Sequence, residues 1–66
     1  MNAAKEFLAE VNGRAITAFL RASGGQATIH AKMFGWSPTE HSRAVRRLSA
    51  SGRIEKVGEC EWRLVA

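Results

Sequence analysis

Cysteine, proline and tyrosine are scarce in this chain of 66 residues, which has one cysteine, one proline and no tyrosine. The single thiol, Cys60, excludes an internal disulfide, and with only two histidines it makes no tetrahedral zinc set of the usual spacing. We therefore expect no metal and no other cofactor. Apolar packing alone must stabilise a single domain, 1–66, near the lower size limit for folding.

Long hydrophobic runs are also absent. The longest are about three residues, too short for a membrane span or for the core of a secretory signal. The hydrophobic fraction of 45% and the charged fraction of 24% exclude a disordered chain. We expect a globular, cytoplasmic protein with no membrane partner.

Acidic residues are outnumbered, with six against ten lysines and arginines and a net charge of +4. The imbalance lies in the second half of the chain, where residues 43–56 contain a single acidic residue, Glu55. This distribution favours a polyanionic partner. The basic residues of that segment are Arg43, Arg46, Arg47, Arg53 and Lys56.

Apolar residues with helical spacing predict a first helix over residues 4–22. Asn12 and Gly13 form its weak point, since Gly costs about 1 kcal/mol relative to Ala inside a helix. Residues 1–12 are therefore either an N-terminal arm or an extension of the helix, and a glycine at 24 or 25 ends it. The predicted buried stripe comprises Ala4, Phe7, Leu8, Val11, Ala15, Ala18, Phe19 and Ala22, widened by Ile16 and Leu20.

A second, short helix of about two turns is predicted within residues 28–35, with Thr28 as its N-cap and Gly35 at its end. Ile29 and Met33 are expected to face inward. Residues 26–28 offer a short strand before it. This segment leads into the third helix through Trp36.

The third helix, 38–51, begins with a strong signal, "SPTE". Ser37 is a hydroxyl N-cap, Pro38 occupies the first helical position, and Glu40 stands where it returns the capping-box hydrogen bond. Trp36 is expected to pack against His41 or the core, and Gly52 to cap the end. Stepped at about 100° per residue, the inward side contains His41, Ala44, Val45 and Leu48, and the outward side Thr39, Ser42, Arg43, Arg46, Arg47 and Ala50.

After Gly52 the apolar period changes from 3.6 to 2, which predicts a β-hairpin over residues 53–65. A Gly58-Glu59 pair suits a two-residue turn. Ile54 and the returning Trp62 and Leu64 supply its apolar face.

The stretch "SRAVRRLSASGRIEKV" is similar to the rhythm shared by winged helix-turn-helix domains of bacterial transcription regulators and of the DNA-reading module of chromosome translocases. The resemblance, over residues 13–65, implies an α+β fold with three helices and a C-terminal hairpin wing. It also implies that helix 38–51 reads the major groove and that the wing meets phosphates or the minor groove. The DNA-binding residues implied are Thr28, His30, Ser37, Thr39, Ser42, Arg43, Arg46, Arg47, Arg53, Lys56 and Arg63.

The sequence thus predicts a sequence-specific protein for double-stranded DNA, a small transcriptional or replication regulator that is nucleoid-associated when bound. Two copies are expected to bind a repeated or palindromic site. No enzymatic activity or small-molecule substrate is expected, because so short a chain leaves little room for a pocket. Two alternatives stay open: a protein-interaction module docking on an acidic partner, and RNA or single-strand binding, which needs exposed aromatic side chains.

Overall fold

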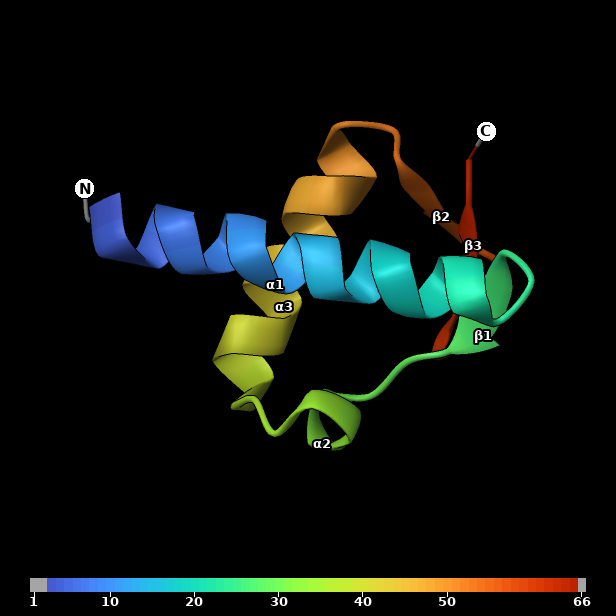
Figure 1. The fold of residues 1–66 in the computed structure, drawn as a ribbon, viewed down its shortest axis with the longest axis horizontal. Coiled ribbons are helices and arrows are strands. Elements are labelled where there is room, and N and C mark those ends of the chain that lie inside the picture. Colours follow the sequence, from blue (N-terminus) through green and yellow to red (C-terminus); the bar gives the residue numbers. More distant parts are fainter. Residues whose placement is uncertain (1–2, 66) are drawn as a thin grey trace.

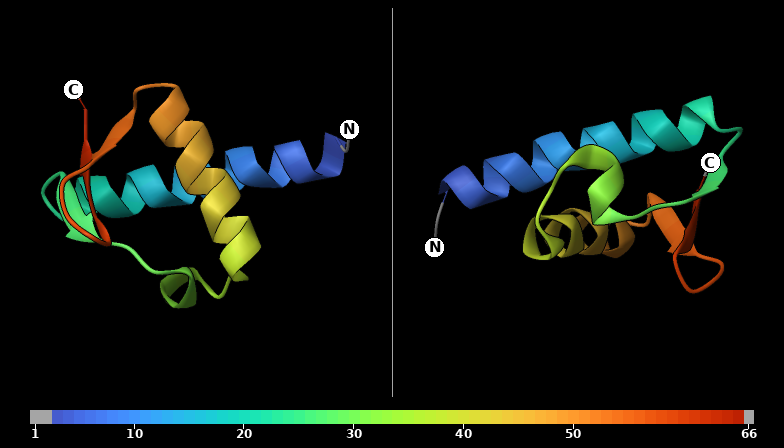
Figure 2. Two further views of the ribbon diagram at one scale, coloured as in Figure 1. Left: turned by 180° about the vertical axis from the view of Figure 1, so that it is seen from behind. Right: turned by 90° about the horizontal axis from the view of Figure 1, so that it is seen from below.

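One long helix spans the molecule, and the other elements all lie on one side of it (Figure 1; Figure 2). The computed structural model describes residues 3–65. Within them the chain forms an α+β fold of three helices and a three-stranded antiparallel sheet. None of these helices is long and apolar enough to traverse a lipid bilayer. The elements are α1 (Ala3–Ala22), β1 (Gln26–Thr28), α2 (Ala31–Phe34), α3 (Pro38–Ala50), β2 (Ile54–Lys56) and β3 (Glu61–Leu64).

Helix α1 runs without interruption through Asn12 and Gly13, so the residues before them, from Ala3 on, extend the helix. It ends at two glycines with positive φ, Gly24 and Gly25, as the sequence predicts. The amide of Gly25 donates to the carbonyl oxygen of Leu20 at 2.7 Å. The helix therefore stops where β1 must begin.

The predicted buried stripe of α1 is wrong for most of its members. The helix buries Ala9, Asn12, Gly13, Ile16 and Leu20, whereas Phe7, Leu8 and Val11 are exposed. The large side chains of Ile16 and Leu20, with the small residues Ala9 and Gly13 beside them, therefore form the buried face of α1. The remaining exposed members of the predicted stripe are Ala4, Ala18 and Ala22, and Ala15 and Phe19 are half-buried.

The core lies where α1, α3 and the sheet meet. Ile16 and Leu20 of α1 are fully buried and pack with Ile29, Ala44, Leu48 and Ile54. Burying an aliphatic side chain contributes about 1.5–3 kcal/mol, so these few residues dominate the stability of a chain this small. The half-buried residues around them are Phe19, Ala27, Phe34, Trp36, Val45, Trp62 and Leu64.

The sheet has the order β1-β3-β2, and the predicted short strand at residues 26–28 is confirmed as β1. Ile54 of β2 stands opposite Leu64 of β3, which confirms their common apolar face. The turn prediction is wrong. The amides of Val57 and Gly58 both donate to the Glu61 carbonyl oxygen, at 2.9 and 3.3 Å, which leaves a loop of residues 58–60, including Cys60, in place of a two-residue turn. A Gly-first two-residue turn needs positive φ, which Gly58 does not have.

Helix α2 is a single turn, shorter than predicted. The amide of Ile29 donates to the carbonyl oxygen of Cys60 at 2.9 Å, so sheet pairing continues beyond Thr28 and the helix starts only after His30. Thr28 therefore ends a strand and does not cap α2. Met33 is predicted to face inward but is 46% exposed, because a helix of one turn buries only the side that contains Phe34.

Candidate nucleic-acid interface

The start of α3 is fixed by local hydrogen bonds. The Ser37 hydroxyl oxygen accepts from the amide of Glu40 at 3.2 Å, and the Glu40 carboxylate accepts from the amide of Ser37 at 2.9 Å. With Pro38 at the first helical position, these bonds form the predicted capping box. The helix ends one residue earlier than predicted, at Ala50, with Ser51 as its C-cap.

Aromatic packing holds this end of α3 against the rest of the protein. The ring of Trp36 stacks on Phe34 with centroids 4.4 Å apart, and Phe34 meets Phe19 of α1 edge to face at 5.8 Å. The Trp36 ring also lies 6.4 Å from the imidazole of His41, as the sequence predicts. This anchoring fixes the direction in which the outward face of α3 points.

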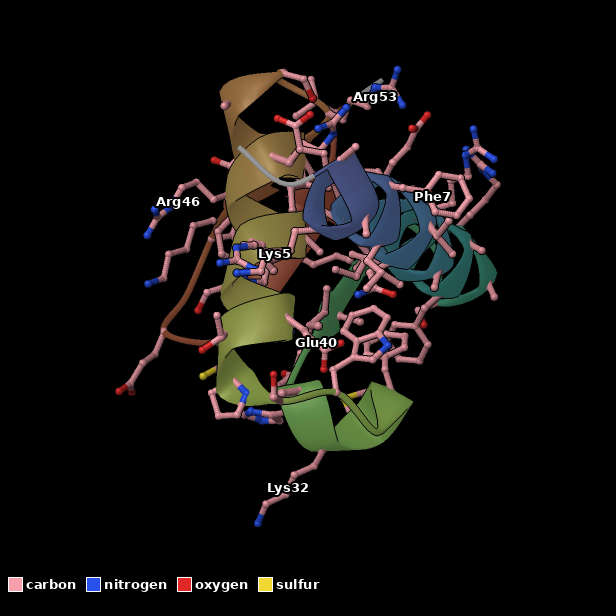
Figure 3. All side chains as sticks on the ribbon, turned by 90° about the vertical axis from the view of Figure 1, so that its left-hand side faces the viewer. Lys5, Phe7, Lys32, Glu40, Arg46 and Arg53 are labelled. Carbon is pink, nitrogen blue, oxygen red and sulfur yellow. The ribbon has the colours of Figure 1, made fainter. Side chains whose placement is uncertain are left out.

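Helix α3 presents an outward surface rich in arginine. Ala44 and Leu48 are buried on its inner side, and the opposite side is exposed. Figure 3 shows Arg46 pointing away from α1. We call this surface the arginine ridge; it comprises Thr39, Ser42, Arg43, Arg46, Arg47 and Ala50, all of them exposed.

The arginines of the ridge are not neutralised by nearby carboxylates. No acidic side chain of the described residues forms an ion pair with Arg43, Arg46 or Arg47. Elsewhere the protein does pair its charges, as Arg14 does with Glu10 at 3.1 Å on α1. The ridge therefore concentrates positive charge that is available to an external anion.

A groove follows one flank of the ridge, between α3 and the N-terminal half of α1. Lys5 and Glu6 of α1 line it together with the three ridge arginines. Figure 3 shows Lys5 lying over the middle of α3. Lys5 is not among the residues that the sequence predicts to bind DNA, because the sequence does not decide whether residues 1–12 form an arm or extend the helix. Treating them as helix places Lys5 one turn before the buried Ala9, next to α3.

The basic residues of the hairpin fall into different environments. Arg63 forms an ion pair with Glu55, its cross-strand neighbour, so its charge is largely compensated. Lys56 is exposed, on the same face of β2 as the buried Ile54. Arg53 lines a second groove with Arg14, between α1 and the C-terminal end of α3. The hairpin therefore adds Lys56 to the side of the sheet that faces the helices, and Arg53 belongs to the groove beside α1.

The remaining predicted residues lie near the first turns of α2 and α3. Thr28 is exposed at the end of β1, His30 is exposed before α2, and Ser37 is exposed at the start of α3. They occupy the segment that leads from the sheet to the ridge. The Ser37 hydroxyl already accepts a hydrogen bond from the amide of Glu40, so Ser37 stabilises the start of α3. A contact between Ser37 and a ligand would come in addition to this role.

His41 differs from the ridge residues beside it, since it faces inward. Among the described residues, its Nδ1 is a buried nitrogen without a hydrogen-bond partner. Burial lowers the pKa of His41 below its ordinary value of 6.5, and positive charge on His30 lowers it further. The imidazole is thus held neutral near pH 7 and adds nothing to the positive charge of the ridge.

Residues 3–65 offer little support for a metal site or for single-strand binding. No three His, Cys, Asp or Glu side chains of this range lie together so as to hold a metal ion. Trp36 and Trp62 are half-buried and pack on the core, so they do not form the exposed stacking platform that single-strand binding needs.

The arrangement thus combines an exposed cationic helix, a flanking basic groove and a hairpin on the same side of α1. The chain matches no protein-family model, no curated protein and no solved structure.

Proposed function

We propose that this protein binds double-stranded DNA as a small winged-helix regulator of transcription or replication, with α3 in the major groove. The observation that carries the proposal is the arginine ridge: three exposed arginines on one helix, none paired with a carboxylate of the described residues. The major groove admits one α-helix and offers guanine O6 and N7 to the guanidinium fork. Arginines that miss a base edge would contact phosphates.

The placement of the hairpin supports the winged-helix part of the proposal. In the right-hand view of Figure 2, α3 and the β2–β3 hairpin both lie on the side of the molecule away from the outer face of α1. A duplex docked along α3 would therefore run close to the hairpin and Lys56. In such domains the recognition helix enters the groove while neighbouring elements contact the backbone.

The groove beside α3 supports the electrostatic part of the proposal. Lys5 adds a cation at one flank of the ridge, and Arg53 adds another beyond Arg47. Rows of cations flanking a recognition helix neutralise successive phosphates and release counterions. These flanking contacts would give affinity, and the ridge would give base preference.

Fluorescence anisotropy with a labelled duplex selected from a random library tests this function. Arg46→Ala should weaken binding about 5- to 150-fold, equivalent to ~1–3 kcal/mol, and relax the preference at one base pair. Arg63→Ala is the matched control, because it removes the same charge from an arginine already paired with Glu55. We expect it to change affinity less than threefold, which follows from the small effect of a compensated surface charge.

Equal losses for the two variants would mean that only net charge matters, and sequence-specific recognition by the ridge would be wrong. No duplex binding by the unmodified protein at low salt would overturn the proposal as a whole.

A second candidate function is docking on an acidic protein surface, which the groove lined by Lys5, Arg43 and Arg47 also suits. A competition experiment with an acidic peptide distinguishes the two candidate functions. A poly-glutamate peptide should displace an acidic protein partner at stoichiometric amounts, whereas it should displace a specific duplex only in large excess, because it lacks base edges.

A further inference from the structure

The outer face of α1 exposes a row of apolar side chains. Phe7 is 64% exposed, Leu8 47% and Val11 41%, although these are among the largest apolar residues of the chain. No other described element covers this face in Figure 1 or Figure 2. We call it the apolar stripe; it comprises Phe7, Leu8, Val11, Ala15, Ala18 and Ala22, which share one side of the helix.

We propose that the apolar stripe joins two copies of this chain, with their α1 helices antiparallel about a two-fold axis. Contiguous exposed apolar surface on a small protein marks an interaction site. Two properties of the stripe, its distribution of side-chain sizes and the charges beside it, indicate that its occupant is another copy of itself.

Side-chain size changes along the stripe. Its N-terminal half has the large residues Phe7, Leu8 and Val11, and its C-terminal half has only alanines. In an antiparallel pair, Val11 of each copy stands opposite Ala15 of the other, and Leu8 opposite Ala18. Large residues then fill the space that small ones leave, as close packing requires. A parallel pair would set Phe7 against Phe7 and leave gaps between the alanines.

The charges on one flank of the stripe follow the same order. Glu10 precedes Arg14 and Arg21 on that side of the helix, and it pairs with Arg14 of its own chain. In a two-fold interface a residue at one position contacts a different position of the other copy, and the reverse contact is identical. Glu10 of each copy therefore lies near Arg14 of the other copy as well as Arg14 of its own helix, so that opposite charges meet around the two-fold axis.

The size of the stripe sets the strength of the pairing. A helix of 20 residues is about 30 Å long, so two such helices side by side bury on the order of 1,000 Å² in total. That area is at the lower end of specific interfaces. The dimer should therefore be reversible and depend on concentration.

Pairing through α1 also determines where the arginine ridges point. Figure 3 shows Phe7 and Arg46 directed to opposite sides of the molecule. Two copies joined by the stripe would present their ridges away from each other, which suits two separate duplex segments better than adjacent half-sites. This consequence rests on the proposed function, whereas the dimer itself does not.

Sedimentation equilibrium between micromolar and near-millimolar concentrations, without DNA, tests the dimer. The unmodified chain should move from monomer to dimer mass, and Val11→Lys should stay a monomer. Val57→Lys is the matched control, since Val57 is 40% exposed but lies beside the hairpin loop, and it should dimerise like the unmodified chain. Far-UV circular dichroism should show both variants folded. Monomer mass at all concentrations, or equal loss in both variants, would overturn the proposal.

Disulfide trapping tests the antiparallel arrangement in a Cys60→Ser background. A mixture of Val11→Cys and Ala15→Cys chains should form the mixed disulfide faster than either chain forms its own. Faster self-coupling of Val11→Cys would contradict antiparallel pairing. A monomer that still binds DNA would refute only this inference, and a dimer that ignores DNA would refute only the proposed function.

Discussion

Gly13 of α1 faces Leu48 of α3 where the two helices cross. A Cβ at position 13 would lie 3.4 Å from both Cγ and Cδ2 of Leu48, which is van der Waals contact. A methyl group at position 13 would therefore just touch the side chain of Leu48. The close approach of the helices explains why a glycine is buried in the middle of a long helix.

Replacing Gly13 should show how large a side chain the crossing of α1 and α3 accommodates. Gly13→Ala should raise the free energy of unfolding by up to about 1 kcal/mol, because Ala removes the helix penalty of Gly and its methyl fits. Gly13→Leu should lower it by about 1–3 kcal/mol, because Leu48 must move. Urea unfolding followed by circular dichroism measures both. A destabilised Gly13→Ala protein would mean that the crossing is tighter than described.

Removal of the α3 cap should cost stability. Ser37→Ala deletes the acceptor for the amide of Glu40 and should lower the free energy of unfolding by about 1 kcal/mol. Glu40→Gln is the control, since its side-chain carbonyl oxygen can still accept from the amide of Ser37. Urea midpoints should fall for the first variant and move little for the second. Equal losses would show that the charge of Glu40 contributes as much as the Ser37 cap.

Acidification should destabilise the fold through His41. Its pKa is lowered in the folded state by burial and by His30, so below pH 6.5 the unfolded chain binds a proton that the folded protein resists. Stability should therefore decline as the pH falls from 7.5 to 5.5. His41→Leu should flatten this decline, and His30→Gln should retain most of it. An unchanged slope in His41→Leu would assign the effect to another group.

DNA affinity should depend steeply on salt. With about five phosphate contacts, a plot of log K against log salt should have a slope of roughly −4 to −5. Lys5→Ala should make the slope shallower by about one if the groove beside α3 follows the backbone, because one contact is lost. Titrations at several salt concentrations measure both values. A slope near zero would be incompatible with a phosphate-contacting surface.

Local signals in the sequence predicted the parts of the fold that local interactions determine. The capping box depends on Ser37 and Glu40 alone, and the end of α1 depends on glycines that tolerate positive φ. Cross-strand pairing of Ile54 with Leu64 follows from the period of two. These features need no information from distant residues.

The buried face of α1 could not be predicted in the same way. Alanine suits both core and surface, so counting apolar residues favours a wide stripe that holds Phe7 and Val11 together with Ile16 and Leu20, whereas only Ile16 and Leu20 of these four are buried. The choice depends on how closely α3 approaches, and Gly13 permits that approach. The placement of Lys5 beside α3 was missed for the same reason, since it depends on the tertiary crossing.

Amide chemical-shift mapping of the unmodified protein during titration with its selected duplex tests the central claim most directly. We predict that the largest shifts fall on the exposed side of α3, around Ser42, Arg43 and Arg46, with smaller shifts near Lys56 and none along Phe7, Leu8 and Val11. Shifts that concentrate on the outer face of α1 and spare the amides of the arginine ridge would contradict the assignment of α3 as the DNA-reading helix.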